Sequence, residues 1–170
     1  YDDHVAALEL GDTIAALIRK SVADQSTVAE LEADCEALRA RITGAPVPKT
    51  LLAEIESFLD SLPAHTTALA VRSSSTAEDG AGFSFAGQYD TYLNIERTPD
   101  AIAASVKACW ASMWQARLLS YRKRLPAAAQ LRPPSMAVVV QIMLRPQAAG
   151  VLFTVDPVTG NERHMVIDSV

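Results

Sequence analysis

The stretch TALAVRSSSTAEDGAGFSFAGQYDTYLNI, residues 67–95, is the most informative part of this 170-residue chain. Its first five residues are small or apolar and predict a short buried strand at 67–71. The polar and glycine-containing residues that follow, 72–88, predict a long loop. The alternation of residue types at 90–95 predicts a second strand, so the stretch is expected to connect two strands of one sheet.

Two interpretations of Arg72 are open from the residues alone. Its planar guanidinium can bind phosphate oxygens, and nearby hydroxyls and backbone amides can satisfy the oxygens that remain. Alternatively, the segment is a surface loop in which Arg72 pairs with Glu78 or Asp79. The three glycines at 80–87 suit a flap whose backbone closes over a ligand. No Walker sequence or dinucleotide fingerprint is present, so P-loop and Rossmann sites are excluded.

Helices are predicted on the N-terminal side of this stretch. Apolar residues recur at helical spacing over 4–20 and 27–42, and a third helix follows the breaker at 43–48 and ends before Pro63. Residues 1–65 are therefore expected to form the helical part, and residues 66–170 the sheet part, of one incomplete domain. The chain begins without Met and stops in an expected strand, which favours a fragment.

Towards the C-terminus, a long helix is predicted from about Pro99 to Arg124, with Trp110 and Trp114 on its apolar side. Strands are predicted at three places, 136–144, 150–155 and 163–170. Helices followed by a mixed, largely antiparallel sheet with a long packing helix predict an α+β fold rather than a doubly wound parallel sheet.

Composition excludes several classes of protein. The formal net charge of −5 gives no footprint for nucleic acid or an anionic membrane. Cys35 and Cys109 have no zinc-site spacing, and Cys109 is expected in the core.

The basic run 122–124 is interpreted as the solvated end of a helix rather than a phosphate track. No run of 18 apolar residues and no signal peptide is present, so a cytoplasmic protein is expected, with neither nucleic acid nor membrane as a partner.

Five motifs follow one another in order along the chain. They are VRSSSTAED at 71–79 with SFAGQYDTYLNI at 84–95, CWAS at 109–112, SYR at 120–122, VVVQIM at 138–143 and AGVLFTVDPVTG at 149–160. Together they resemble the signature of the N-terminal ATP-grasp-like domain shared by phosphoenolpyruvate synthases, pyruvate phosphate dikinases and rifampicin phosphotransferases. The resemblance covers roughly residues 68–170, and the helical first third is consistent with it only in kind.

The resemblance implies an ATP site and assigns residues to it. Arg72 would contact the phosphates of ATP. Gly87, Gln88 and Thr91 belong to the motif whose backbone would close over those phosphates. Gln141 corresponds to a strand glutamine near the adenine. Magnesium is an implied cofactor, but its carboxylate ligands, like the family's phosphate-binding lysine, are expected outside this chain, so no catalytic or metal-binding residue is assigned within it.

The resemblance also implies a larger parent enzyme. That enzyme would cleave ATP and pass a phosphoryl group through a phosphohistidine domain to pyruvate, forming phosphoenolpyruvate, or to a related acceptor bound by another domain. An antibiotic phosphotransferase of the rifampicin type is the alternative. Some dikinases carry a basic residue at the position of Val155, so this valine favours the synthase or antibiotic branches over the dikinases. A non-catalytic binding module that kept the fold is a second alternative. The fragment alone is expected to be inactive.

Two further groups of residues are interpreted as structural. His4, His65 and His164 lie in no phosphohistidine motif and are expected to be surface or capping residues. Thr154 and Asp156 are expected to order a buried turn between two strands rather than to bind nucleotide.

Overall fold

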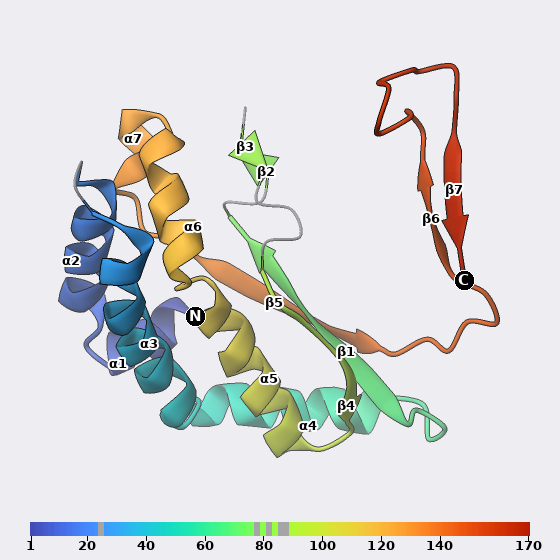
Figure 1. Ribbon diagram of the computed structural model, residues 1–170. Helices are drawn as coiled ribbons and strands as arrows, with labels where there is room; N and C mark the ends of the chain where they lie inside the picture. Colours follow the sequence, from blue (N-terminus) through green and yellow to red (C-terminus); the bar gives the residue numbers. More distant parts are fainter. Residues whose placement is uncertain (24–25, 77–78, 81–82, 85–88) are drawn as a thin grey trace.

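The computed structural model describes residues 1–23, 26–76, 79–80, 83–84 and 89–170 of the chain. Figure 1 shows helices packed on one side of a three-stranded sheet, and a hairpin that extends away from it. The helices are α1 (Asp2–Ala7), α2 (Gly11–Val22), α3 (Val28–Gly44), α4 (Lys49–Ser61), α5 (Pro99–Ser112), α6 (Ala116–Tyr121), the 3-10 helix η1 (Arg122–Arg124) and α7 (Ala127–Gln130). The strands are β1 (Ala68–Ser75), β2 (Asp79–Gly80), β3 (Phe83–Ser84), β4 (Thr91–Glu96), β5 (Met136–Ile142), β6 (Gly150–Phe153) and β7 (Val166–Ser169). The arrangement confirms the predicted α+β fold.

Two of the three predicted N-terminal helices form where the sequence places them. α3 begins at a capping box, in which the Thr27 hydroxyl accepts the Glu30 N–H and the Glu30 carboxylate accepts the Thr27 N–H at 2.8 Å. α4 follows Pro48 directly. The helix predicted over 4–20 is instead divided into α1 and α2, because Glu9 between them has a φ of 53°, which a right-handed helix does not allow. No helix within the described ranges is long and apolar enough to cross a membrane.

The three-stranded sheet is antiparallel and has the order β4-β1-β5, so β1 is its central strand. β1 is longer than predicted, because it includes Arg72 and runs to Ser75, residues that the sequence assigns to a loop. The cause is tertiary: this segment pairs residue by residue with β5, from Val139 to Met136. Arg72 is therefore held in the middle of a sheet rather than at the start of a loop.

α5 packs across the inner face of this sheet and contacts all three strands. The helix predicted from Pro99 to Arg124 is divided into α5, α6 and η1, with a break at residues 113–115. Trp114 in this break is fully buried, and its indole N–H donates to the Tyr1 hydroxyl at 3.2 Å. Cys109 is buried in the core, as predicted.

Of the three histidines predicted to lie at the surface or to cap helices, His4 is buried and has the second role. Its side chain is only 2% exposed, and its ring centroid lies 5.1 Å from that of Trp110. The ring Nε2 donates to the Ile42 carbonyl at 3.1 Å, which satisfies a helix-end acceptor within the core. His65 and His164 are exposed, as predicted.

Arg122 is also buried, which corrects its interpretation as part of a solvated helix end. Its guanidinium donates to three backbone carbonyls, those of Ala129, Gln130 and Arg132. Burial lowers the pKa of this guanidinium. The Arg122 side chain thus ties η1 to α7 and the loop after it.

β6 and β7 form a separate antiparallel hairpin in which all four residues of each strand are exposed. The turn within it is ordered by Asp156, whose carboxylate accepts the N–H groups of Val158 and Thr159 at 2.8 and 3.0 Å. The predicted turn is therefore present. It lies at the surface rather than buried, since Thr154 is exposed and Asp156 is half-buried.

Candidate functional site

The outer face of the three-stranded sheet, opposite α5, carries three of the five residues predicted to bind nucleotide. Along β1, Leu69 and Val71 are fully buried towards the helices. Because consecutive strand residues point to opposite faces, Ala70 and Arg72 share the outer face. The alternation of β1 thus separates the core from a surface that can receive a ligand.

Antiparallel pairing brings three of the five predicted residues together on this face. Arg72 is paired with Thr91 of β4 and with Val139 of β5, and Gln141 is paired with Ala70. Arg72, Thr91 and Gln141 line one open groove of about 390 Å³. The other lining residues are Ala70, Leu93, Met143, Leu144 and Pro146. Residues from three strands that are distant in sequence therefore share one concave surface.

Among the described lining residues, Arg72 carries the only charge. Its side chain is exposed, and it makes no hydrogen bond or ion pair with any residue that the structure describes. Of the two alternative partners, Glu78 lies outside the described residues and Asp79 is described only in its backbone. The predicted site residues Gly87 and Gln88 also lie outside the described residues.

The groove has a polar end and an apolar end. Arg72 and Thr91 form the polar end. Gln141 lies on the neighbouring strand β5, two residues beyond Val139, the partner of Arg72. At about 3.3–3.4 Å per strand residue, this places Gln141 about 7 Å from Arg72 along the strand direction. Beyond Gln141, the chain continues beside β1 and supplies the apolar end. Leu144, which is 74% exposed, and Pro146 belong to it. A ligand with a charged end and a flat apolar end would match this polarity.

A β-bulge in β4 keeps Tyr92 and Ile95 on the same face of the sheet. Between Tyr92 and Ile95, β4 advances three residues while β1 advances two. The extra residue is accommodated where Asn94 adopts a left-handed φ of 57°, a conformation that asparagine tolerates better than most residues. Tyr92 and Ile95 consequently both pack against the core, while Thr91 and Leu93 line the groove.

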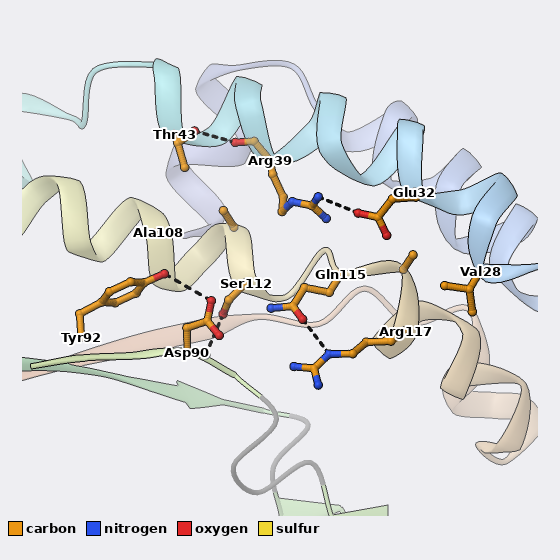
Figure 2. Close-up of a pocket in the computed structure, with 12 residues that line it drawn as sticks. Val28, Glu32, Arg39, Thr43, Asp90, Tyr92, Ala108, Ser112, Gln115 and Arg117 are labelled. Carbon is orange, nitrogen blue, oxygen red and sulfur yellow. Dashed lines mark hydrogen bonds and ion pairs between the residues drawn. The ribbon is translucent and has the colours of Figure 1, made fainter.

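On the helix side of β4, Asp90 is held by three neighbours, two of which Figure 2 shows. Its N–H donates to the Ser112 hydroxyl at 3.3 Å, and its carboxylate accepts the Tyr92 hydroxyl at 3.3 Å. Its carbonyl accepts the Cys109 thiol, with sulfur and oxygen 3.7 Å apart. Because Asp90 directly precedes Thr91, these contacts fix the start of β4 against the end of α5.

Two of these three contacts come from groups that stay protonated at neutral pH. Burial, followed by the charge of the Asp90 carboxylate, raises the pKa of Tyr92 to about 12. Burial, again followed by Asp90, raises the pKa of Cys109 to about 12. The phenol and the thiol therefore remain hydrogen-bond donors to Asp90 across the neutral range.

A second pocket, of about 600 Å³, lies between α3, α5, α6 and the start of β4 (Figure 2). Its charged side chains already have partners. Arg39 donates to Glu32 at 2.9 Å and to the Trp114 carbonyl at 2.8 Å. Arg117 donates to the Gln115 side chain at 2.8 Å. Because its guanidinium groups are engaged, this pocket offers less to an incoming anion than the groove beside Arg72.

The described residues do not fit a magnesium site. Mg²⁺ is bound through carboxylate and other oxygen ligands, and the described residues that line the groove include no carboxylate. Within the described ranges, no group of three or more His, Cys, Asp or Glu side chains is placed to hold a metal ion. The chemistry that the described groove residues supply is restricted to binding and orientation.

Sequence reasoning missed the apolar residues of the groove and the contacts behind it. Leu93 lies in the predicted strand 90–95, and strand alternation could have placed it on the same face as Thr91. No sequence signal places the Ser112 hydroxyl against the Asp90 N–H, because that contact joins residues 22 positions apart. The apolar end, with Leu144 and Pro146, depends on where the chain runs after β5.

Comparison with known proteins gives consistent matches. The family model described as the pyruvate phosphate dikinase AMP/ATP-binding domain matches residues 1–170. A rifampicin phosphotransferase from a Streptomyces species is 41% identical over 96% of this chain, and a prodigiosin-synthesizing transferase from Serratia marcescens is 44% identical over 78%. A phosphoenolpyruvate synthase from Aeropyrum pernix is 40% identical over 83% of the chain. The matched region spans only 18%, 14% and 17% of these three relatives, respectively.

Proposed function

Because the chain belongs to the family of pyruvate phosphate dikinase AMP/ATP-binding domains, we propose that the groove on the outer face of its sheet is the site where it binds ATP. The observation that carries the proposal is the convergence of Arg72, Thr91 and Gln141, from β1, β4 and β5, on one groove. The guanidinium of Arg72 faces solvent there without a described partner, which leaves its donors available for phosphate oxygens.

The polarity of the groove favours one orientation of the nucleotide. The phosphates lie at the end formed by Arg72 and Thr91, where a fixed positive charge and a hydroxyl can share their oxygens. The adenine lies towards Leu144 and Pro146, whose exposed apolar surface would be buried by the flat base. Gln141 lies between these ends, and its amide offers both a donor and an acceptor to a ligand.

We further propose that the chain serves a larger ATP-dependent phosphotransferase. The relatives named above are several times longer than the matched region, and one of them is a phosphoenolpyruvate synthase. In the proposed parent, ATP is cleaved at this domain, and the phosphoryl group passes through a phosphohistidine domain to pyruvate. Residues 1–65 supply the helical support, and residues 66–170 carry the groove. Carboxylates that hold Mg²⁺ come from outside the described residues.

An antibiotic hydroxyl is the second candidate acceptor. The observation that favours it is the 41% identity to a rifampicin phosphotransferase, which is as close as the match to the synthase. The groove itself does not distinguish the two, because both reactions would start from ATP bound at Arg72.

Calorimetric titration of the 170-residue chain with ATP tests the site, with Arg72→Ala and Arg117→Ala as a matched pair. Both variants remove an exposed arginine, but only Arg72 lines the groove, whereas Arg117 lines the second pocket. We expect Arg72→Ala to weaken binding at least about tenfold and Arg117→Ala to leave it unchanged, since a charge-assisted contact contributes roughly 1.5–3 kcal/mol. The reverse pattern would place ATP in the second pocket and reject the proposal.

The role in the parent enzyme is tested by turnover. In the full-length protein, Arg72→Ala should abolish ATP cleavage, while the acceptor is identified by the phosphorylated product. Normal ATP cleavage by that variant would remove Arg72 from the proposed site. Tight ATP binding without any cleavage in the wild-type parent would favour the non-catalytic module.

A further inference from the structure

Every polar group of Asp90 has a partner on the side of the sheet away from the groove. The N–H is held by Ser112, the carbonyl by Cys109 and the carboxylate by Tyr92. The next residue, Thr91, is paired with Arg72 and lines the groove. The contacts of Asp90 therefore fix the start of β4, and the position of this strand end sets the spacing between Thr91 and Arg72.

Ser112 is the rigid member of this set. It is the last residue of α5 and is only 3% exposed. Its hydroxyl donates to the Cys109 carbonyl at 2.7 Å, so its lone pairs point away from that bond and accept the Asp90 N–H at 3.3 Å. A hydroxyl that is fixed by one hydrogen bond presents a fixed acceptor to the strand.

We propose that Ser112 is a positioning residue for the ATP site: its hydroxyl anchors Asp90 and thereby holds Thr91 at the distance from Arg72 that phosphate binding requires. The inference rests on the proposed function of the groove and adds to it a residue that contacts no part of the ligand. Ser112 lines the second pocket behind β4, and it is absent from the lining of the groove.

Loss of this hydroxyl should act on binding more than on folding. Without it, the Asp90 N–H faces the second pocket, where water can replace the lost acceptor and limit the cost to the fold. Water does not tie the strand to α5, so the start of β4 gains freedom that ATP binding must then remove. The groove keeps its residues but loses their fixed spacing.

Threonine and valine at position 112 form the decisive pair of variants. Ser112→Thr keeps the hydroxyl, and Ser112→Val has nearly the same shape without it, so any strain from the added methyl groups is common to both. Ser105→Ala is the control for a lost helix hydroxyl. Ser105 is also buried on α5, and its hydroxyl donates to the Ala101 carbonyl at 2.8 Å without a described hydrogen bond to β4.

ATP affinity of these variants is measured by calorimetry, beside their thermal midpoints. We expect Ser112→Val to raise the Kd about tenfold relative to Ser112→Thr, with a thermal midpoint lower by only a few degrees, since the hydrogen bond to the Cys109 carbonyl is lost as well. Ser105→Ala should bind as the wild-type chain does. Equal affinities for the threonine and valine variants would overturn the proposal, because the hydroxyl would then have no part in binding.

Amide hydrogen exchange separates failure of this inference from failure of the proposed ATP site. The Asp90 N–H should exchange about tenfold faster in Ser112→Val than in Ser112→Thr, whether or not ATP binds. If Arg72→Ala binds ATP as well as the wild-type chain, the proposed site is wrong even when this exchange difference is found. If Arg72→Ala loses binding and the exchange rates are equal, the anchor is wrong and the site stands.

Discussion

Replacing Val139 by glutamate should weaken ATP binding, and replacing it by lysine should strengthen it. Val139 is the β5 partner of Arg72 and is 46% exposed, so it accepts a polar side chain without disturbing the core. Directly paired residues have Cβ atoms about 4.5–5.5 Å apart, which places a new charge beside the phosphates proposed to lie on Arg72.

The size of the effect follows from Coulomb's law. Two unit charges about 6 Å apart interact by about 0.7 kcal/mol at a dielectric constant near 80 and by about 2.8 kcal/mol at one near 20. Because Val139 is partly exposed, a value of about 1 kcal/mol per unit charge is appropriate, which is about a fivefold change in Kd. The glutamate and lysine variants should therefore differ by about 30-fold.

Stability should change in the opposite sense to affinity. Glutamate opposite Arg72 forms a favourable cross-strand pair, whereas lysine places like charges opposite each other, with effects of roughly 0.2–1 kcal/mol. Calorimetric titration at low and high salt gives the affinities, urea unfolding gives the stabilities, and Val139→Gln is the uncharged control. Equal affinities for the two charged variants, or a difference that added salt does not reduce, would refute the placement of phosphate beside Arg72.

The remaining predictions concern stability and thiol chemistry. Arg122→Met should lower the free energy of unfolding in urea by roughly 2–3 kcal/mol, because three backbone carbonyls lose a charged donor. The control Arg124→Met should change that free energy by less than about 0.5 kcal/mol. Equal effects of the two variants would show that the Arg122 contacts contribute nothing specific. Mass spectrometry should find Cys35 and Cys109 unmodified by an alkylating reagent at pH 8 until urea unfolds the chain, since both are fully buried. Burial raises the pKa of Cys35 from 9.0 to about 11 and that of Cys109 to about 12. The stability that these protonated thiols contribute is therefore complete below pH 9 and is lost as the pH rises through about 11 to 12. The urea midpoint of the wild-type chain should fall over that interval. In a variant with alanine at both positions, the midpoint should fall by less.

The sequence predicts those features that depend on local patterns. The helix predicted over 27–42 from its apolar spacing forms as α3, because that spacing depends only on residues three and four apart. The order of helices and strands is enough for the α+β class. The resemblance assigns Arg72, Thr91 and Gln141 to one site, and the three residues do line one groove.

Features that depend on tertiary contacts could not be predicted in this way. The serines after Arg72 have no strong preference for strands, and they are strand residues because β5 pairs with them. His4 is buried because its ring packs on Trp110 and bonds to the Ile42 carbonyl, and both partners are far from His4 in the sequence. Arg122 is similar, since its partners are carbonyls that only the folded loop brings together.

The bulge in β4 also has a consequence for protein engineering. Side chains on a strand change face with every residue, so inserting or deleting one residue ordinarily exchanges the two faces. In β4, the additional residue near Asn94 has already made one such exchange, which is why Tyr92 and Ile95 both point inward. A designer who varies loop lengths in this domain can alter the connections before Asp90 or after Glu96. Deleting Asn94 would remove the additional residue, so that β4 would pair with β1 in regular alternation while Tyr92 and Ile95 still face inward.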